Sequence, residues 1–235
     1  MIILAFDSTA KVATAAVCDN DKLLALYSID NGLTQSELLL PMAESMLGAL
    51  HLSFSDVELL ATSVGPGSFT GVRIGTALVK GLAFGKRIPC VGVSTLDELA
   101  QNLIGIDGII LPCMDARRGQ VYNAVFKSSQ NELTRLTEDR AISIDSLADE
   151  LAGYSDTKVY VCGDAYEAVE SALRNQGINV AKTPPLLIPE NAYSVARVAY
   201  MKYLSGEYTS DIDISPTYLR MPQAERERLE RLKNS

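Results

Sequence analysis

The sequence has no tryptophan and one histidine, His51, among its 235 residues. A single histidine excludes metal sites built from several imidazoles. It also weakens Cys–His and Ser–His schemes, because each needs an imidazole beside the nucleophile. His51 follows a predicted apolar helix, and we interpret it as structural.

Cysteine is also scarce, with four residues and no Cys-x-x-Cys spacing. Each lies in or beside an apolar run, which is typical of reduced core residues in a cytoplasmic protein. The first six residues lack a basic region and are too short an apolar run for a signal peptide or membrane span. We therefore predict a cytoplasmic location and no membrane partner. The cysteines are Cys18, Cys90, Cys113 and Cys162.

Positive charge is the third shortage, since 21 Lys and Arg face 29 Asp and Glu and the formal net charge is −8. Nucleic-acid affinity depends on cations that neutralise phosphates. If this protein functions with RNA, we expect another subunit to bind the RNA. The 47% hydrophobic content is slightly more than a solvated monomer requires and indicates a partner surface.

Glycine, in contrast, is concentrated in one segment, Gly-Pro-Gly-Ser-Phe-Thr-Gly-Val-Arg-Ile-Gly-Thr at 65–76. Ser68 or Thr70 can cap the helix that follows. The segment lacks the Lys-Ser or Lys-Thr ending of a P-loop and the spacing of a Rossmann fingerprint. We interpret Gly71 and Gly75 as a shallow groove through which this helix approaches a helix of a partner.

A pattern of strand, Asp turn and strand occurs twice, about half a chain apart. Residues 2–6 lead into Asp7, and residues 109–114 lead into Asp115; both copies begin Ile-Ile-Leu. The shared order favours duplication over coincidence. We predict an α/β protein of two related domains, over 1–104 and 105–235.

Hydrophobic periodicity predicts the elements of both halves. Helices are expected over 36–50, 68–85, 95–102, 144–151, 165–176 and 192–204. Strands are expected over 2–6, 13–17, 22–29, 59–64, 88–93, 109–114, 120–127, 132–137 and 159–162. The tail from Gln223 carries many charged residues of both signs and is predicted to be a solvated or frayed helix.

Two of these helices, 36–50 and 68–85, are apolar nearly all round and must be covered on more than one side. They are either central core helices or part of an interface with another subunit, and the sequence alone favours neither. The candidate interface residues are Leu39, Met42, Met46, Arg73, Ala77 and Lys80.

The turn Asp7-Ser8-Thr9 has the residue types that hold Mg²⁺ and phosphate in a phosphotransferase. Lys11, however, replaces the glycine that would let backbone approach a phosphate, and Arg117 and Arg118 crowd the second turn. We favour turn capping for both aspartates and expect no cofactor or metal. A kinase or ATPase using Asp7 is the enzyme alternative. A hydrolase using Ser68 ranks last, because Gly-x-Ser-x-Gly is absent.

Six motifs in order give the chain a resemblance to a known family, TsaB (also called YeaZ). They are Ile-Leu-Ala-Phe-Asp-Ser-Thr at 3–9, Gln-Ser-Glu-Leu-Leu-Leu-Pro at 35–41, the glycine segment at 65–75, Val-Ser-Thr-Leu at 93–96, Asp-Ala-Arg-Arg-Gly-Gln-Val-Tyr at 115–122 and Pro-Thr-Tyr-Leu-Arg at 216–220. The sequence departs from the family at Gln35, where His is frequent, and at Ser8-Thr9, where the order is reversed. The Gln35 change puts any helix-entry contact of that His in doubt.

The resemblance implies an actin-like (ASKHA) duplicated fold and a non-catalytic role in tRNA threonylcarbamoyladenosine modification. In that family the paralogue TsaD carries the metal and transfers threonylcarbamoyl to the adenine next to the anticodon, and TsaE is an ATPase. The subunit pairs with TsaD, or with itself when alone, through helices matching 36–50 and 68–85. It meets tRNA only through the complex. The absence of His-x-x-x-His from this sequence agrees with that division of labour.

Overall fold

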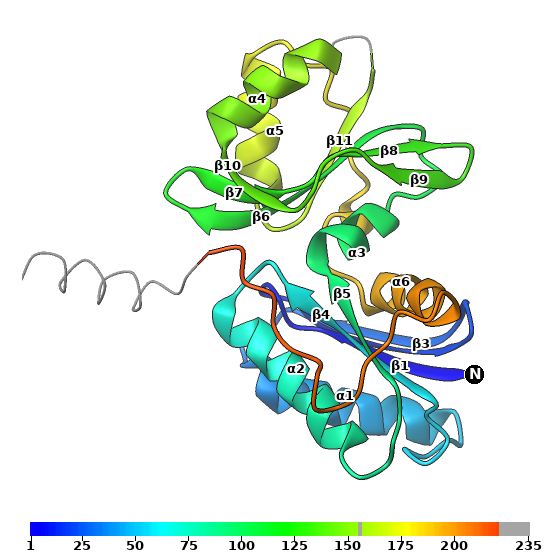
Figure 1. Cartoon of the computed structure of the whole chain (residues 1–235). Coiled ribbons are helices and arrows are strands. Elements are labelled where there is room, and N and C mark those ends of the chain that lie inside the picture. Colours follow the sequence, from blue (N-terminus) through cyan, green and yellow to red (C-terminus); the bar gives the residue numbers. More distant parts are fainter. Residues whose placement is uncertain (155–156, 221–235) are drawn as a thin grey trace, which may run out of the picture.

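Two mixed β-sheets organise the fold (Figure 1). In the computed structural model, which describes residues 1–154 and 157–220, the first sheet has the strand order β3-β2-β1-β4-β5. The second has the order β10-β7-β6-β8-β9, with β11 paired to β6. The strands of the first sheet are β1 (Ile2–Asp7), β2 (Ala13–Asp19), β3 (Lys22–Ile29), β4 (Leu59–Gly65) and β5 (Cys90–Ser94).

The central strand β1 is buried on both faces because helices cover both sides of the first sheet. Side chains alternate along a strand, so Leu4 and Phe6 face α1 (Gln35–Ala49) and α2 (Phe69–Ala83). Ile3 and Ala5 face α6 (Ala192–Leu204) on the opposite side (Figure 1). The apolar run of β1 therefore reflects a sheet enclosed between helices.

The second sheet is covered in the same way. Its strands are β6 (Gly108–Arg117), β7 (Gln120–Asn123), β8 (Phe126–Ser129), β9 (Glu132–Arg135), β10 (Arg140–Ser143) and β11 (Val159–Cys162). One face packs on α4 (Ile144–Leu151) and α5 (Tyr166–Asn175), and the other on α3 (Thr95–Gln101). Two short 3-10 turns, η1 (Ala152–Tyr154) and η2 (Pro185–Leu187), complete the described elements.

Two helices, α3 and α6, each pack on the sheet of the other half of the chain, which differs from the predicted division into 1–104 and 105–235. Helix α6 comes from the second half of the sequence but packs on the first sheet. The residues after it stay there, because Thr209 pairs with Cys90 and Ile214 is buried beside α2. Helix α3, from the first half, packs on the second sheet. The apolar face of the first sheet that lies opposite α1 and α2 must be covered, and no helix of residues 1–104 covers it.

The predicted strand 120–127 is wrong, because the chain breaks it at residues 124–125. Strand β7 pairs with the end of β6, and β8 pairs with its beginning. Pro112 lies between these two stretches and has no N–H to donate to a ladder. The Pro112 carbonyl accepts a hydrogen bond from the Asn123 side chain at 3.0 Å. Strand β10 was not predicted at all.

The predicted duplication is visible in the topology. In each half a strand (β1 or β6) forms an antiparallel hairpin with the next strand and pairs in parallel with a later one (β4 or β11). The helix predicted from Gln223 lies outside the described residues. Over the described ranges, no helix is both long and apolar enough to cross a bilayer.

Candidate functional site: a basic cleft between the halves

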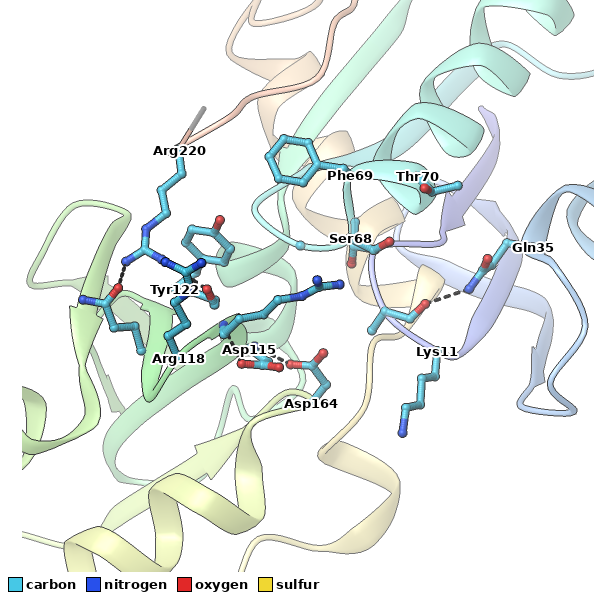
Figure 2. Close-up of a pocket in the computed structure, with 16 residues that line it drawn as sticks. Lys11, Gln35, Ser68, Phe69, Thr70, Asp115, Arg118, Tyr122, Asp164 and Arg220 are labelled. Atoms are coloured by element: carbon cyan, nitrogen blue, oxygen red, sulfur yellow. Dashed lines mark hydrogen bonds between the residues drawn. The ribbon is translucent and has the colours of Figure 1, made fainter. Parts of the chain in front are cut away.

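A cavity of about 490 Å³ lies between the two halves (Figure 2). The first half contributes residues 9–11, Gln35 and the start of α2. The second half contributes the β6–β7 turn, Tyr122 and Asp164, and Arg220 from the carboxyl-terminal segment closes one side. The duplicated hairpin turns therefore face each other across one hollow.

Asp7 does not line this cavity. Its side chain is fully buried and accepts hydrogen bonds from the Thr9 amide at 2.8 Å and the Thr9 hydroxyl at 3.0 Å. Asp115 accepts the Arg117 amide at 2.7 Å in the second copy of the turn. Turn capping, which the sequence favoured for both aspartates, is confirmed. Ser8 donates to the Gly71 carbonyl at 2.8 Å, so this turn is bound to α2.

The glycines of α2 approach this turn and not a partner, which corrects the interpretation from the sequence. A Cβ on Gly71 would lie 1.8 Å from the Ser8 carbonyl oxygen, and one on Gly75 would lie 2.6 Å from the Thr62 hydroxyl. No side chain fits at Gly71 without moving backbone. The groove formed by Gly71 and Gly75 is filled by the protein's own chain.

Helix α2 begins at the cavity with its predicted cap. Ser68 accepts the Gly71 amide through its hydroxyl at 3.2 Å, and its own amide donates to the Thr9 carbonyl at 2.7 Å. Gln35, which replaces the frequent His, donates to the Ala10 carbonyl at 2.7 Å. A helix-entry contact is therefore present despite that replacement.

Four cationic side chains surround the cavity: Lys11, Arg117, Arg118 and Arg220. Arg117 and Arg118 have φ values of 64° and 57°, which non-glycine residues adopt rarely. Arg220 donates to the Ala116 carbonyl at 3.1 Å and to the Gln120 side chain, and its guanidinium lies over the Tyr122 ring. The sequence did not indicate that Arg220 reaches this site, because 100 residues separate it from Gln120.

A buried acidic cluster lies in the core near the Asp7 turn and was missed from the sequence. It consists of Asp7, Glu98 and Glu190. Glu98 accepts the Ser63 hydroxyl at 2.5 Å and the Asn191 amide at 2.6 Å. Burial raises the pKa of all three carboxyl groups, and the neighbouring Asp7 carboxyl raises the pKa of Glu98 and Glu190 further. The sequence contained no clear signal for this cluster, because Glu98 follows Asp97 in a short helix in which four of the seven residues are polar.

Three of the six predicted interface residues are wrong, because their side chains belong to the protein's own core. Leu39, Met42 and Met46 are 1%, 4% and 0% exposed and pack between α1 and the first sheet. Two more of the predicted interface residues form hydrogen bonds with the carboxyl-terminal segment. Arg73 donates to the Tyr218 hydroxyl and Lys80 to the Ile212 carbonyl, both at 2.8 Å.

Ala77, the sixth, lies exposed between them on α2. All four cysteines are buried free thiols, as predicted. Among the described residues, no group of three or more His, Cys, Asp or Glu side chains is arranged to hold a metal ion.

Comparison with known proteins assigns the chain to a family. The family model described as TsaD, tRNA N6-adenosine threonylcarbamoyltransferase, matches residues 34–227. The chain is 31% identical over 229 residues to the tRNA threonylcarbamoyladenosine biosynthesis protein TsaB of Bacillus subtilis (strain 168), covering 96% of each. The chain belongs to the TsaB (YeaZ) family.

Other TsaB relatives and solved structures agree. The Escherichia coli (strain K12) TsaB is 29% identical over 222 residues, which cover 94% of this chain and 95% of that protein. The structure of YeaZ from Pseudomonas aeruginosa superimposes with a TM-score of 0.76 at 24% identity, over 93% of this chain and 99% of that one. The predicted actin-like duplicated α/β fold is confirmed.

Proposed function

We propose that this TsaB-family chain serves tRNA threonylcarbamoyladenosine biosynthesis in the cytoplasm as a non-catalytic subunit. It binds and activates the catalytic paralogue TsaD, together with the ATPase TsaE, and meets tRNA only through that complex. The names of the TsaB relatives support the process. The match to the family model described as TsaD supports a common origin with the transferase.

The observation that best supports the non-catalytic role is that Asp7 is buried and hydrogen-bonded within its own turn. A phosphotransferase of this fold would need that carboxylate in the cleft, where it could orient a metal-bound water. Here the carboxyl group is fully buried and accepts hydrogen bonds from the amide and the hydroxyl of Thr9. Ser68, the alternative nucleophile, caps α2 and has no histidine beside it in the cavity lining.

The outer surface of α1 and α2 is the proposed docking surface for TsaD, and for a second copy of the chain when TsaD is absent. It centres on Ala77 and includes the exposed apolar residues Leu40 and Phe84, which are 37% and 79% accessible. Arg73 and Lys80 border it beside the carboxyl-terminal segment. Apolar side chains on a helical surface favour association with a partner.

Co-purification with TsaD tests this role in two matched variants. Ala77→Glu places a charge at the centre of the proposed surface, and Ala168→Glu places the same change on an exposed position of α5. We expect both variants to fold. Ala77→Glu should lose TsaD binding and tRNA modification in a reconstitution with TsaD and TsaE, whereas Ala168→Glu should retain both.

Two results would overturn the proposal. One is equal TsaD binding by the two variants, which would place the interface elsewhere. The other is nucleotide turnover by the chain alone that disappears in Asp7→Asn, which would restore the enzyme alternative.

A further inference from the structure

A second cavity, of about 660 Å³, shares no lining residue with the cleft described above. It lies between α3, the β8–β9 hairpin and the end of α6 (Figure 1). Helix α6 covers the face of the first sheet that lies opposite α1 and α2. A partner bound in this cavity therefore leaves the proposed docking surface for TsaD free.

Apolar side chains from three elements line this cavity. Phe126 and Leu133 come from the hairpin, Ile104 follows α3, and Val198 and Met201 lie on α6. Met201 is 63% exposed, so α6 holds a large apolar side chain in water at the cavity wall. Apolar surface exposed beside a cavity favours a bound ligand with apolar groups.

One buried polar side chain in the cavity wall lacks a hydrogen-bond partner. Gln101 is 6% exposed, and its Nε2 atom meets no acceptor in the part of the chain that the structure describes. A buried donor without an acceptor destabilises a folded protein. A carbonyl group of a ligand in the cavity supplies the missing acceptor.

Strand β9 is the edge of the second sheet and borders the same cavity. The Leu136 amide donates to the Val125 carbonyl, which sets the hydrogen-bonding register of the hairpin. Bonded and non-bonded pairs alternate in an antiparallel ladder, so Thr134 bonds to β8, whereas the backbone groups of Leu133 and Arg135 point outward. Those outward groups have no backbone partner elsewhere in the described chain.

A strand added to this edge places every second side chain in the cavity. Side chains alternate between the two faces of a sheet, and Leu133 and Arg135 lie on the face that packs on α3. Residues of an added strand that face the same way meet Val198 and Met201 of α6. In this mode of recognition, backbone pairing supplies affinity and the cavity selects the side chains.

The charges around the cavity favour a carboxylate on the ligand. Arg135 is already paired with Asp97 at 2.6 Å, and Glu207 accepts a hydrogen bond from a neighbouring serine. Glu132 alternates to the other face of the sheet. Lys202 lines the α6 wall and forms no ion pair within residues 1–154 and 157–220. It is therefore the available partner for an acidic residue.

We propose that the β9 edge and this cavity bind an extended peptide segment of a partner protein, with apolar residues at alternate positions and an acidic residue at the next inward position. The segment pairs with the backbone of Leu133 and Arg135 and packs its apolar side chains on Met201. It also gives Gln101 an acceptor and Lys202 a counter-charge. This site is separate from the surface proposed for TsaD.

Fluorescence polarisation with the full chain tests the proposal with the amidated peptide Thr-Val-Thr-Leu-Thr-Asp, labelled at its amino end. Its valine, leucine and aspartate share one face of a strand. We expect binding with a Kd below about 1 mM. The permuted peptide Val-Leu-Thr-Thr-Thr-Asp has the same composition but places its two apolar side chains on opposite faces, and it should not bind.

Two N-methylated peptides test the backbone pairing. Methylation of the leucine amide and methylation of the preceding threonine amide remove neighbouring donors, of which only one faces β9. One of the two changes should therefore weaken binding by at least about tenfold, and the other should alter it by about twofold or less.

Three variants locate the site. Met201→Glu should weaken binding by at least about tenfold, because the peptide would bury a charge there. Leu204→Glu is the matched control, since Leu204 is 66% exposed on the same helix but does not line the cavity. Gln101→Leu should weaken binding by about fivefold without lowering stability to urea, because it removes a donor that is unsatisfied in the free protein. A purely structural Gln101 would instead lower stability.

Ala77→Glu separates this site from the proposed docking surface, and it should bind the peptide as the wild type does. The proposal is overturned if the alternating peptide fails to bind, if the permuted peptide binds equally well, or if Met201→Glu and Leu204→Glu behave alike. Equal effects of the two N-methylations would exclude strand pairing and would also overturn it.

Discussion

At the residue scale, the contact between Gly71 and Ser8 fixes how α2 meets the Asp7 turn. The Ser8 carbonyl oxygen occupies the space where a Cβ at position 71 would lie, and Ser8 donates back to the Gly71 carbonyl. Glycine is therefore required at this position for close packing within the chain. Its backbone freedom has no part in this, because Gly71 lies in regular helix.

Gly71→Ala should destabilise the protein by about 1–3 kcal/mol or more, because the new methyl group overlaps backbone that cannot move independently. Gly81→Ala, ten residues along the same helix, is the matched control. A Cβ there meets nothing within 4 Å. It should increase stability by about 0.5–1 kcal/mol through helix propensity. Urea unfolding measures both, and equal effects of the two changes would contradict this account.

At the scale of elements, the carboxyl-terminal segment acts as an arm along α2. Between residues 209 and 218 it pairs with Cys90, contributes Ile214 to the core and donates the Thr217 amide to the Val64 carbonyl at 2.7 Å. It also accepts the Lys80 ammonium through the Ile212 carbonyl. The arm therefore covers one flank of the helix on which we place the docking surface.

Ile214→Ala should destabilise the protein by about 2–5 kcal/mol, because Ile214 is 2% exposed in the core between the arm and the first sheet. Ile212→Ala is the same change two residues earlier, at a side chain that is 79% exposed, and should alter stability by about 0.5 kcal/mol or less. Chemical denaturation monitored by circular dichroism measures the pair. A small effect at Ile214 would show that the arm is not anchored there.

At the scale of the whole molecule, the buried acidic cluster joins segments from both halves of the chain. Asp7 ends β1, Glu98 lies on α3 and Glu190 precedes α6. The Glu190 Oε1 atom has no hydrogen-bond partner among the described residues. Burial raises the pKa of Glu190 well above its ordinary value, and Asp7 adds to the rise. The folded protein therefore retains a proton that the unfolded chain releases.

Because the folded protein keeps this proton, the direction in which its stability changes with pH can be predicted. A carboxyl group with a raised pKa in the folded state binds more protons when folded, so stability falls as pH rises from its ordinary pKa towards the folded value. Glu190→Gln removes one such group. We expect its free energy of unfolding to fall less between about pH 5 and pH 8 than that of the wild type, by up to roughly 1.4 kcal/mol per pH unit.

Urea unfolding at several pH values measures this difference. Glu138→Gln is the same substitution at an exposed glutamate and should leave the slope unchanged. A Glu190→Gln variant with the wild-type slope would show that Glu190 does not hold the proton.

The sequence by itself determined the local features of this protein. Strand and helix periodicity predicted both halves, with the third strand and helices 144–151 and 192–204 matching the structure residue for residue. The roles of Ser68 as a cap and of Asp7 as a turn acceptor were also predictable. Each of these depends on residues within a few positions of one another, where spacing fixes geometry.

Only the tertiary structure decided which neighbours these elements have. It placed α6 on the first sheet, buried Met42 and Met46 in the core, and turned Gly71 towards Ser8. It also brought Arg220 to the turn that holds Arg118. These contacts join residues tens to more than a hundred positions apart. Hydrophobic pattern shows that a helix face must be covered, but not which part of the chain covers it.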